Sequence, residues 1–327
     1  MGRRAEDENA KLRRVADMGQ MKMATARGFI QDRKKEDRTV NGKCLVSIGM
    51  PVYNEERYIE QALQSLLSQS VENFELIISD NASTDRTGEI CLAYAAKDPR
   101  VRYYRMETNL GSIANFNRVF QLSNATYFFW ASGHDMRHET FIARCVEILE
   151  QDTSVVLCYS GARWLEPDGR LGDVMSGHVE TRGTSHQVLR FLTVIWGLGG
   201  FAHQSNGIMR SDALKRTSLR NTIGPDVLLL HELALLGTFA EVPEPLLCIR
   251  RLRDYGSWHH YFVKGFGPAA ERRSARYLYS KMIYEHVRIV VKHTNRFRDK
   301  VTLVPLVILC MLTKYRWVLH GLRSLDV

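Results

Sequence analysis

The sequence lacks several features that would assign it to a membrane or extracellular class. It has no run of about 18 apolar residues, so we expect no membrane-spanning helix. Residues 1–43 lack the apolar core of a signal peptide. The six cysteines form no Cys-x-x-Cys pair, and most lie within apolar runs. These absences argue against a disulfide framework and a zinc site, and they favour a reducing, cytoplasmic location.

Positive charge is concentrated at the two ends of the chain. Residues 1–43 hold 12 Lys/Arg against 7 Asp/Glu, and residues 271–327 hold 12 against 4. The net charge of +9 therefore leaves −4 for residues 44–270, which argues against a nucleic-acid channel through the middle. The basic ends fit two alternatives equally well. In the first, they bind an anionic partner, either a lipid-linked acceptor or the inner face of a membrane. In the second, they are a solvated tail and a solvated helix face with no partner.

The first half of the chain alternates between strand-like and helix-like segments. Apolar runs bounded by turn residues predict strands, and apolar residues at helical spacing predict helices between them. The expected strands are 45–50, 74–79, 101–105, 127–131 and 155–159, and the expected helices are 57–69, 85–96, 112–122 and 139–149. This alternation predicts an α/β fold with a mostly parallel sheet flanked by helices.

The second half alternates less regularly. Pro167, Asp168 and Gly169 predict a hairpin turn. The expected strands are 205–209, 239–242 and 246–250, the expected helices are 185–195, 226–236, 269–292 and 300–325, and a pocket-shaping loop is expected at 196–204. The apolar run 301–312 is too short to span a bilayer. Its basic and aromatic neighbours fit an interfacial helix, packing on the protein body, or a homodimer interface.

Three of the expected strands end in polar or acidic residues. Asn54 and Glu55 follow the first strand, Asp80 follows the second, and His134 and Asp135 follow the fourth. Ligands of open parallel sheets bind beyond the carboxyl ends of the strands. The three strand ends therefore predict one wall of a single site.

In combination, these three segments resemble the family 2 glycosyltransferases, which use nucleotide-sugar donors on a fold of the GT-A type. The resemblance covers about residues 44–251. It implies a GT-A domain at 43–255. Outside that domain, the charged residues 1–42 lack a strand or long amphipathic pattern and predict a basic, disordered arm, and residues 256–327 are expected to form a basic helical extension. Within the domain, 43–135 would be the nucleotide-binding half and 136–255 the acceptor half.

The resemblance implies nucleotide contacts at the first two strand ends. Asp80 would accept a hydrogen bond from a pyrimidine imide nitrogen, which favours a UDP- or dTDP-type donor, and Ser83 lies in the same turn. Four residues after the first strand would surround the nucleoside: Pro51, Tyr53, Asn54 and Glu55. Turn formation and capping by these side chains are the alternative explanation at both strand ends.

A third binding segment precedes the expected helix 112–122. The N-terminus of this helix would attract the diphosphate, with Asn109 and Gly111 at its start. Capping alone explains Asn109 equally well.

The resemblance places a metal motif at His134 and Asp135. Asp135 matches the acid expected to hold Mg²⁺ or Mn²⁺ against the diphosphate leaving group. The family pattern has two or three acids here, whereas this chain has one, preceded by His134. His134 is then a second metal ligand, a hydrogen-bond donor to the diphosphate, or only a loop residue, and a weak or absent metal site stays open.

The acceptor side of the resemblance starts at Asp226. This residue matches the catalytic base of inverting members, although an Asp at this point also suits a helix N-cap. Glu232, on the same expected helix, is the second candidate for the base. Arg250 would act as a cationic clamp on the diphosphate.

The implied function is transfer of a sugar, with inversion, from a nucleoside diphosphate donor to a hydroxyl of a cell-surface or lipid-linked glycan. The main alternative is a non-catalytic nucleotide-sugar-binding or scaffold protein, supported by the missing second acid at His134. A nucleotidyltransferase is disfavoured, because the loop after the first strand has acids and no Gly.

Overall fold

The computed structural model describes residues 44–198, 202–219, 224–252 and 275–316. These residues belong to one structural unit, Cys44–Val327. The expected arm, part of the expected loop 196–204 and the ends of the two C-terminal helices lie outside the described residues.

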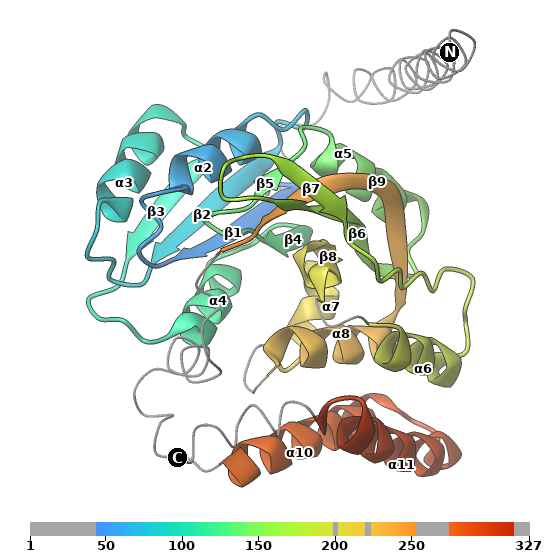
Figure 1. Cartoon of the computed structure of the whole chain (residues 1–327). Coiled ribbons are helices and arrows are strands. Elements are labelled where there is room, and N and C mark those ends of the chain that lie inside the picture. Colours follow the sequence, from blue (N-terminus) through green and yellow to red (C-terminus); the bar gives the residue numbers. More distant parts are fainter. Residues whose placement is uncertain (1–43, 199–201, 220–223, 253–274, 317–327) are drawn as a thin grey trace, which may run out of the picture. The chain divides into compact units, whose positions relative to one another are not determined.

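Four parallel strands form the first half of the sheet (Figure 1). They are β1 Val46–Val52, β2 Phe74–Asp80, β3 Val101–Arg105 and β4 Tyr127–Trp130, in the order β3-β2-β1-β4. β1 pairs in parallel with both β2 and β4, and β2 pairs in parallel with β3. The predicted parallel α/β arrangement is confirmed, and it brings the carboxyl ends of these strands to one edge.

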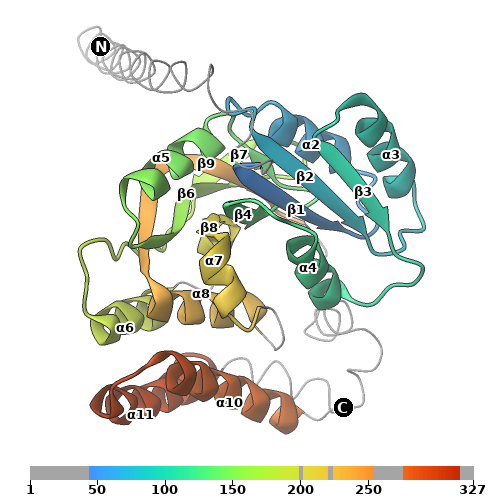
Figure 2. The same cartoon turned by 180° about the vertical axis from the view of Figure 1, so that it is seen from behind.

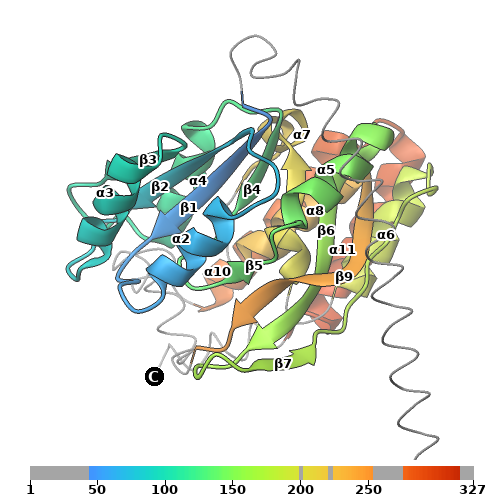
Figure 3. The same ribbon diagram turned by 90° about the horizontal axis from the view of Figure 1, so that it is seen from above.

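Successive strand residues point into two separate cores, because side chains alternate between the faces of a sheet. Ile78 belongs to a core with residues of α2, α3 and α5, whereas Ile77 belongs to a core with α4 and the later helices. The four helices are α2 Ile59–Leu67, α3 Thr87–Lys97, α4 Ser112–Gln121 and α5 Phe141–Gln151. Figure 1 shows α2, α3 and α5 above the sheet and α4 below it, and Figure 3 views the sheet from the α2 side.

The second half of the sheet is mixed. Its strands are β5 Met136–Arg137, β6 Val155–Leu165, β7 Leu171–Val174, β8 Ile208–Arg210 and β9 Thr238–Arg250. β8 lies antiparallel between β4 and β6, so β6 runs in the same direction as β4. β9 runs parallel to β6, and its end pairs with the short β5. β7 folds back on β6 across the predicted hairpin turn.

Two of the strand predictions are wrong in detail. β9 is one strand rather than two, although Pro243 and Pro245 remove hydrogen-bond donors from it. Register shifts between β6 and β9 on both sides of Gly161 accommodate the prolines, and a Cβ at Gly161 would lie 3.1 Å from the Pro243 carbonyl oxygen. The expected strand 205–209 begins only at Ile208, because the preceding residues form the 3₁₀ helix η1 His203–Asn206.

The helices of the second half pack into the same core as α4. They are α6 Gln187–Gly197, α7 Ser211–Arg216, α8 Pro225–Leu236, α10 Ala275–His293 and α11 Phe297–Thr313. Most of α8 is apolar and buried, since α6, α10 and the sheet surround it, and His231 and Glu232 are its buried polar residues. Figure 1 and Figure 2 show α10 and α11 below α6 and α8. Within the described ranges, no helix is long and apolar enough to cross a membrane.

Two histidines are buried where α8 meets α10. The rings of His231 and His286 lie 5.1 Å apart, and Phe191 and Tyr315 pack against His231. Among the described residues, neither ring nitrogen of His231 has a hydrogen-bond partner. Burial lowers the pKa of His231 well below its ordinary value and lowers the pKa of His286 to about 4. Both rings are therefore neutral at pH 7.

We expect the protein to lose stability as the pH falls from 6.5 toward 4. The unfolded chain binds protons at both histidines in this range and the folded protein does not, so protonation favours unfolding. For His286, a pKa of about 4 instead of 6.5 corresponds to a loss on the order of 3 kcal/mol in the free energy of unfolding. Urea unfolding at about pH 7 and about pH 5 measures the effect.

The substitution His231→Phe keeps an aromatic ring against Phe191 and should reduce this pH dependence. His186→Gln, at an exposed position next to α6, is the matched control and should leave it unchanged. An equal loss of stability in wild type and His231→Phe would contradict the explanation.

Candidate active site

The loops after β1 and β2 are held together by hydrogen bonds between side chains and backbone. The N–H of Asn54 donates to Ser83 Oγ (3.0 Å), and Asn54 Oδ1 accepts the N–H of Thr84 (2.8 Å). The N–H of Glu55 donates to Thr87 Oγ1 (2.7 Å). Asn54 has a φ of 54°, which Asn tolerates better than most residues. Asn54 and Ser83 thus fix the shape of the loop in which Glu55 lies.

Pro51 and Tyr53 flank the end of β1. Pro51 pairs with Ser79 on β2, and Val52 pairs with Asp80, so the two strands end at the same level. Tyr53 follows directly and is half-buried. The predicted nucleoside-binding residues of the first two strands therefore lie side by side at the carboxyl edge.

Asp80 is fully buried and paired at the end of β2. Its Oδ2 accepts hydrogen bonds from the Tyr103 hydroxyl (2.8 Å) and from Arg105 Nη1 (2.6 Å), and its Oδ1 accepts the N–H of Ser83 (2.8 Å). A nucleotide base could bond to this carboxylate only if Arg105 or Tyr103 moved. Neither partner was predicted from the sequence, although Arg105 ends the expected third strand opposite Asp80.

Asn109 caps the turn that leads into α4. Its Oδ1 accepts the N–H of Gly111 (2.9 Å) and the side-chain amide of Asn81 (2.7 Å). Gly111 has a φ of 87° and precedes α4, a conformation that favours glycine. One turn into α4, the amide of Asn115 donates to the Ser79 carbonyl (2.8 Å). The N-terminus of α4 is thereby fixed beside the ends of β1 and β2.

His134 and Asp135 lie in the loop after β4, close to Glu55. His134 Nδ1 is 3.0 Å from Glu55 Oε1, and His134 Nε2 is 4.0 Å from Asp135 Oδ1. A Cβ at Gly133 would lie 2.9 Å from Glu55 Cγ, so this approach needs glycine. The structure thus brings a second carboxylate to the motif from the first strand end rather than from the loop itself.

Arg250, at the end of β9, holds this loop in place. Its backbone N–H donates to Asp135 Oδ1 (2.9 Å), and its side-chain Nε donates to the His134 carbonyl (2.9 Å). Its Nη2 donates to Gln61 Oε1 (2.7 Å), and its guanidinium lies 4.1 Å from the ring centre of Tyr58. The predicted clamp residue is therefore buried and bonded within the site. Tyr58 and Gln61 carried no sequence signal for this role.

The donor set fits a divalent cation only in part. In the described ranges, no three His, Cys, Asp or Glu side chains are arranged to hold a metal ion. Asp135 Oδ1 is engaged by Arg250, so Oδ2 is the oxygen that could meet a cation. A cation here would draw most of its ligands from a bound diphosphate, and Mn²⁺ would accept the imidazole of His134 more readily than Mg²⁺ would.

A second buried arginine lies beneath the loop. Arg137 of β5 donates from Nη2 to the Trp130 carbonyl (2.9 Å), and its guanidinium faces the rings of Phe129 (4.9 Å) and Phe141 (5.4 Å). Burial lowers its pKa to about 10, and the charge of Asp135 opposes the shift. Arg137 is therefore still charged at pH 7.

The two candidate bases have different surroundings on α8. Asp226 is the second residue of the helix and is half-buried, after Gly224 with a φ of 60°. Glu232 is fully buried and accepts hydrogen bonds from the N–H of Ser218 (2.7 Å), from Lys292 (3.1 Å) and from His293 (2.7 Å).

The carboxylate of Glu232 joins α8 to α10. Burial raises its pKa, but the hydrogen bonds from His293, Ser218 and Lys292 outweigh burial and the net shift is downward. The ion pairs therefore stabilise the fold at neutral pH, and this contribution is lost as the pH falls through the lowered pKa of Glu232.

We expect Glu232→Gln to lower the free energy of unfolding by about 3 kcal/mol, because it leaves Lys292 and His293 without their buried anion. Urea unfolding at pH 7 measures the loss. The matched control is Glu89→Gln, whose side chain is 70% exposed in a surface pair with Arg86 and should cost under about 0.5 kcal/mol. Equal stability of the two variants would show that the Glu232 pairs do not hold α10.

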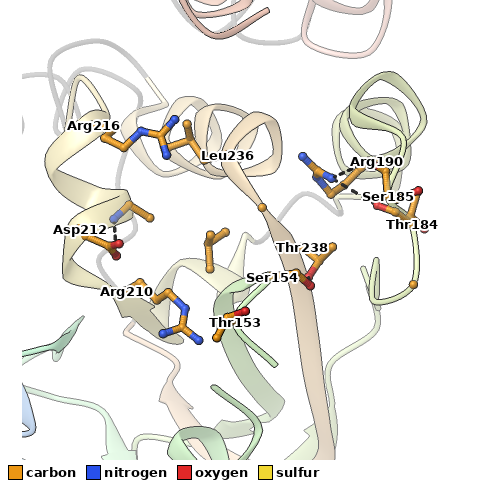
Figure 4. A pocket seen from close by; sticks show the side chains of 14 residues that line it. Thr153, Ser154, Thr184, Ser185, Arg190, Arg210, Asp212, Arg216, Leu236 and Thr238 are labelled. Carbon is orange, nitrogen blue, oxygen red and sulfur yellow. Dashed lines mark hydrogen bonds between the residues drawn. The ribbon is translucent and has the colours of Figure 1, made fainter. Parts of the chain in front are cut away.

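The described cavity lies at the other edge of the sheet (Figure 4). It has a volume of about 470 Å³ and lies at the starts of β6 and β9, next to Ser154 and Thr238. Arg190 and Arg210 line the cavity. Their side chains donate hydrogen bonds to backbone carbonyls, among them those of Ala234 and Val155. The cavity is therefore remote from the strand-end residues, and Arg190 and Arg210 serve the fold.

Comparison with known proteins identifies the family. Residues 47–215, just over half of the chain, match the profile of glycosyl transferase family 2. Glycosyltransferase GlyG of Streptococcus pneumoniae is 31% identical over 114 residues, which are 35% of this chain and 38% of that protein. The chain belongs to glycosyl transferase family 2, and its alignment spans less than half the length of this relative.

Solved structures share the fold at low sequence identity. TarS of S. aureus, in complex with UDP, has a TM-score of 0.60 and 16% identity over 81% of this chain and 70% of that one. The mannosyltransferase PcManGT of Pyrobaculum calidifontis, in complex with GDP-Man and Mn²⁺, has a TM-score of 0.53 and 13% identity over 86% of this chain and 74% of that one. These likenesses confirm the predicted GT-A fold.

Proposed function

We propose that this protein transfers a sugar from a nucleoside diphosphate donor to an acceptor hydroxyl, with inversion at the anomeric carbon. The observation that carries the proposal is the meeting of Glu55, His134, Asp135 and Arg250 at the carboxyl edge of a family 2 fold. Solved structures of this fold that hold UDP, UDP-GlcNAc or GDP-Man support a nucleotide-sugar donor.

In this proposal the nucleoside lies over the ends of β1 and β2. Pro51, Tyr53 and Asn54 border it from one strand, and the buried pair of Asp80 and Arg105 borders it from the next. Arg105, whose side chain is 48% exposed, is the member of this pair that a base or phosphate would meet first. A UDP- or dTDP-type donor remains favoured, because a pyrimidine imide can donate to Asp80 when Arg105 moves aside.

The diphosphate lies between the N-terminus of α4 and the loop after β4. Asp135, with His134 beside it, would hold Mg²⁺ or Mn²⁺, which would neutralise charge on the leaving diphosphate. Gly111 lets the backbone approach the phosphates, and Asn109 fixes that turn. Arg250 acts by fixing the position of the Asp135 carboxylate, through its backbone N–H, rather than as an exposed clamp.

Asp226 is the base that takes the proton from the acceptor hydroxyl. Inversion requires one displacement, in which the hydroxyl oxygen attacks the anomeric carbon from the face opposite the diphosphate while the bond from that carbon to the diphosphate oxygen breaks and the nucleoside diphosphate leaves. The acceptor is a cell-surface or lipid-linked glycan, a proposal that rests on the basic ends of the chain and on the family. A lipid-linked acceptor would bring the reaction to a membrane surface.

We expect one nucleoside diphosphate to raise the melting temperature in the presence of Mn²⁺ or Mg²⁺, and Asp135→Ala to abolish the metal-dependent part. A ligand at about 100 times its dissociation constant adds about 2.7 kcal/mol to stability. A thermal-shift screen of UDP, dTDP and GDP, with metal or with EDTA, measures this. The matched control is Asp168→Ala, which removes a carboxylate at an exposed position. Failure of every nucleotide to shift wild type would refute the donor site.

We expect Asp226→Asn to lower sugar transfer at least about 100-fold while nucleotide binding stays within about twofold. The amide cannot accept the proton, but it keeps the shape of the carboxylate. Transfer is measured by release of nucleoside diphosphate with a panel of glycan and lipid-linked acceptors. Unchanged transfer would exclude Asp226 as the base. Donor binding without transfer to any acceptor would favour the alternative of a non-catalytic nucleotide-sugar-binding protein.

A further inference from the structure

α11 presents an apolar face that no described element covers. One side of the helix is buried against α6 and α10 through Leu303, Val307, Cys310 and Met311. The opposite side is exposed and consists of Phe297, Val301, Pro305, Ile308, Leu309 and Leu312. Their spacing of three or four residues aligns them along one stripe. For the large apolar side chains among them, the exposed fractions run from 36% to 80%.

The rim of this face is basic. Arg296 and Arg298 lie exposed at its N-terminal end, and Arg316 lies exposed at its C-terminal end. The single acidic residue between 294 and 316 is Asp299, which pairs with Arg298 (3.4 Å). An apolar stripe bordered by arginines is typical of a helix that lies in the interface of an anionic membrane.

An exposed tryptophan lies at the end of α6, which is tied to the C-terminal end of α11. The ammonium group of Lys314 donates to the backbone carbonyls of Ile195 and Trp196, which ties the end of α6 to the end of α11. Trp196 is 46% exposed. Tryptophan suits the headgroup level of a bilayer because its ring is apolar and its N–H is polar.

Charge decides between a membrane and a second copy of the chain as the occupant. Two copies that joined through this face would bring two sets of arginine side chains together around an apolar contact. Such like charges repel, whereas anionic headgroups attract them. The face also holds no acidic side chain that could pair with the arginines of another copy, since Asp299 is already paired.

We propose that the exposed face of α11, with its rim of Arg296, Arg298 and Arg316, docks this protein on the surface of an anionic lipid bilayer. The helix lies in the plane of the membrane interface with its apolar stripe toward the acyl chains. This surface is separate from the strand-end site, and the proposal does not depend on the proposed transfer reaction.

Flotation of the full chain with lipid vesicles tests the proposal. Wild type should bind vesicles that contain about 30% phosphatidylglycerol and bind pure phosphatidylcholine vesicles at least about tenfold more weakly. The double substitution Leu309→Glu and Leu312→Glu should reduce binding to anionic vesicles by about tenfold or more. The matched control is Leu92→Glu with Leu171→Glu, at positions that are 57% and 58% exposed on α3 and β7, and it should bind as wild type does.

Substitution of the rim arginines separates electrostatic binding from non-specific hydrophobic binding. Arg296→Gln with Arg316→Gln should weaken binding to anionic vesicles several-fold and reduce its dependence on salt. Thermal shift with nucleoside diphosphates on the same variants should match wild type, so a failure of the docking proposal is distinct from a failure of the donor site.

Three results would overturn the proposal. Wild type could fail to bind anionic vesicles, or the Leu309→Glu and Leu312→Glu variant could bind them as tightly as wild type does. Sedimentation velocity could also show a dimer that this variant abolishes, with no effect on vesicle binding. The last result would identify a second copy of the chain as the occupant of the face.

Discussion

The carboxyl edge of the sheet depends on one buried arginine. Arg250 joins the end of β9 to the loop after β4 through Asp135 and the His134 carbonyl, and to α2 through Gln61 and the ring of Tyr58. A buried guanidinium is costly to desolvate unless its donors are satisfied. These three elements therefore keep their relative positions, and the backbone N–H of Arg250 orients the Asp135 carboxylate.

The acidic motif is completed in space rather than along the chain. The loop after β4 carries one aspartate. Hydrogen bonds between the loops after β1 and β2 hold Glu55 in place, within hydrogen-bond distance of His134. Gly133 permits that approach because any side chain there would collide with Glu55.

The sequence predicts the parts of the fold that local periodicity encodes. The expected bounds of β1, β2 and β4 differ from the observed bounds by one or two residues, because buried parallel strands are short apolar runs that end in turn residues. β5 was not expected, since two residues have no period and its pairing depends on β9, far along the chain. The pairing of Asp80 with Arg105 and the role of Arg250 were also invisible, because each depends on a tertiary contact between distant segments.

The surroundings of Glu232 separate the two candidate bases on physical grounds. A general base must reach the hydroxyl proton of its acceptor, and its carboxylate must have a lone pair to receive that proton. Glu232 is fully buried, and Ser218, Lys292 and His293 all donate to it. Breaking these bonds to admit an acceptor would leave two cationic or basic groups without their anion. Asp226 lies at the half-buried start of the same helix, so it stays the proposed base.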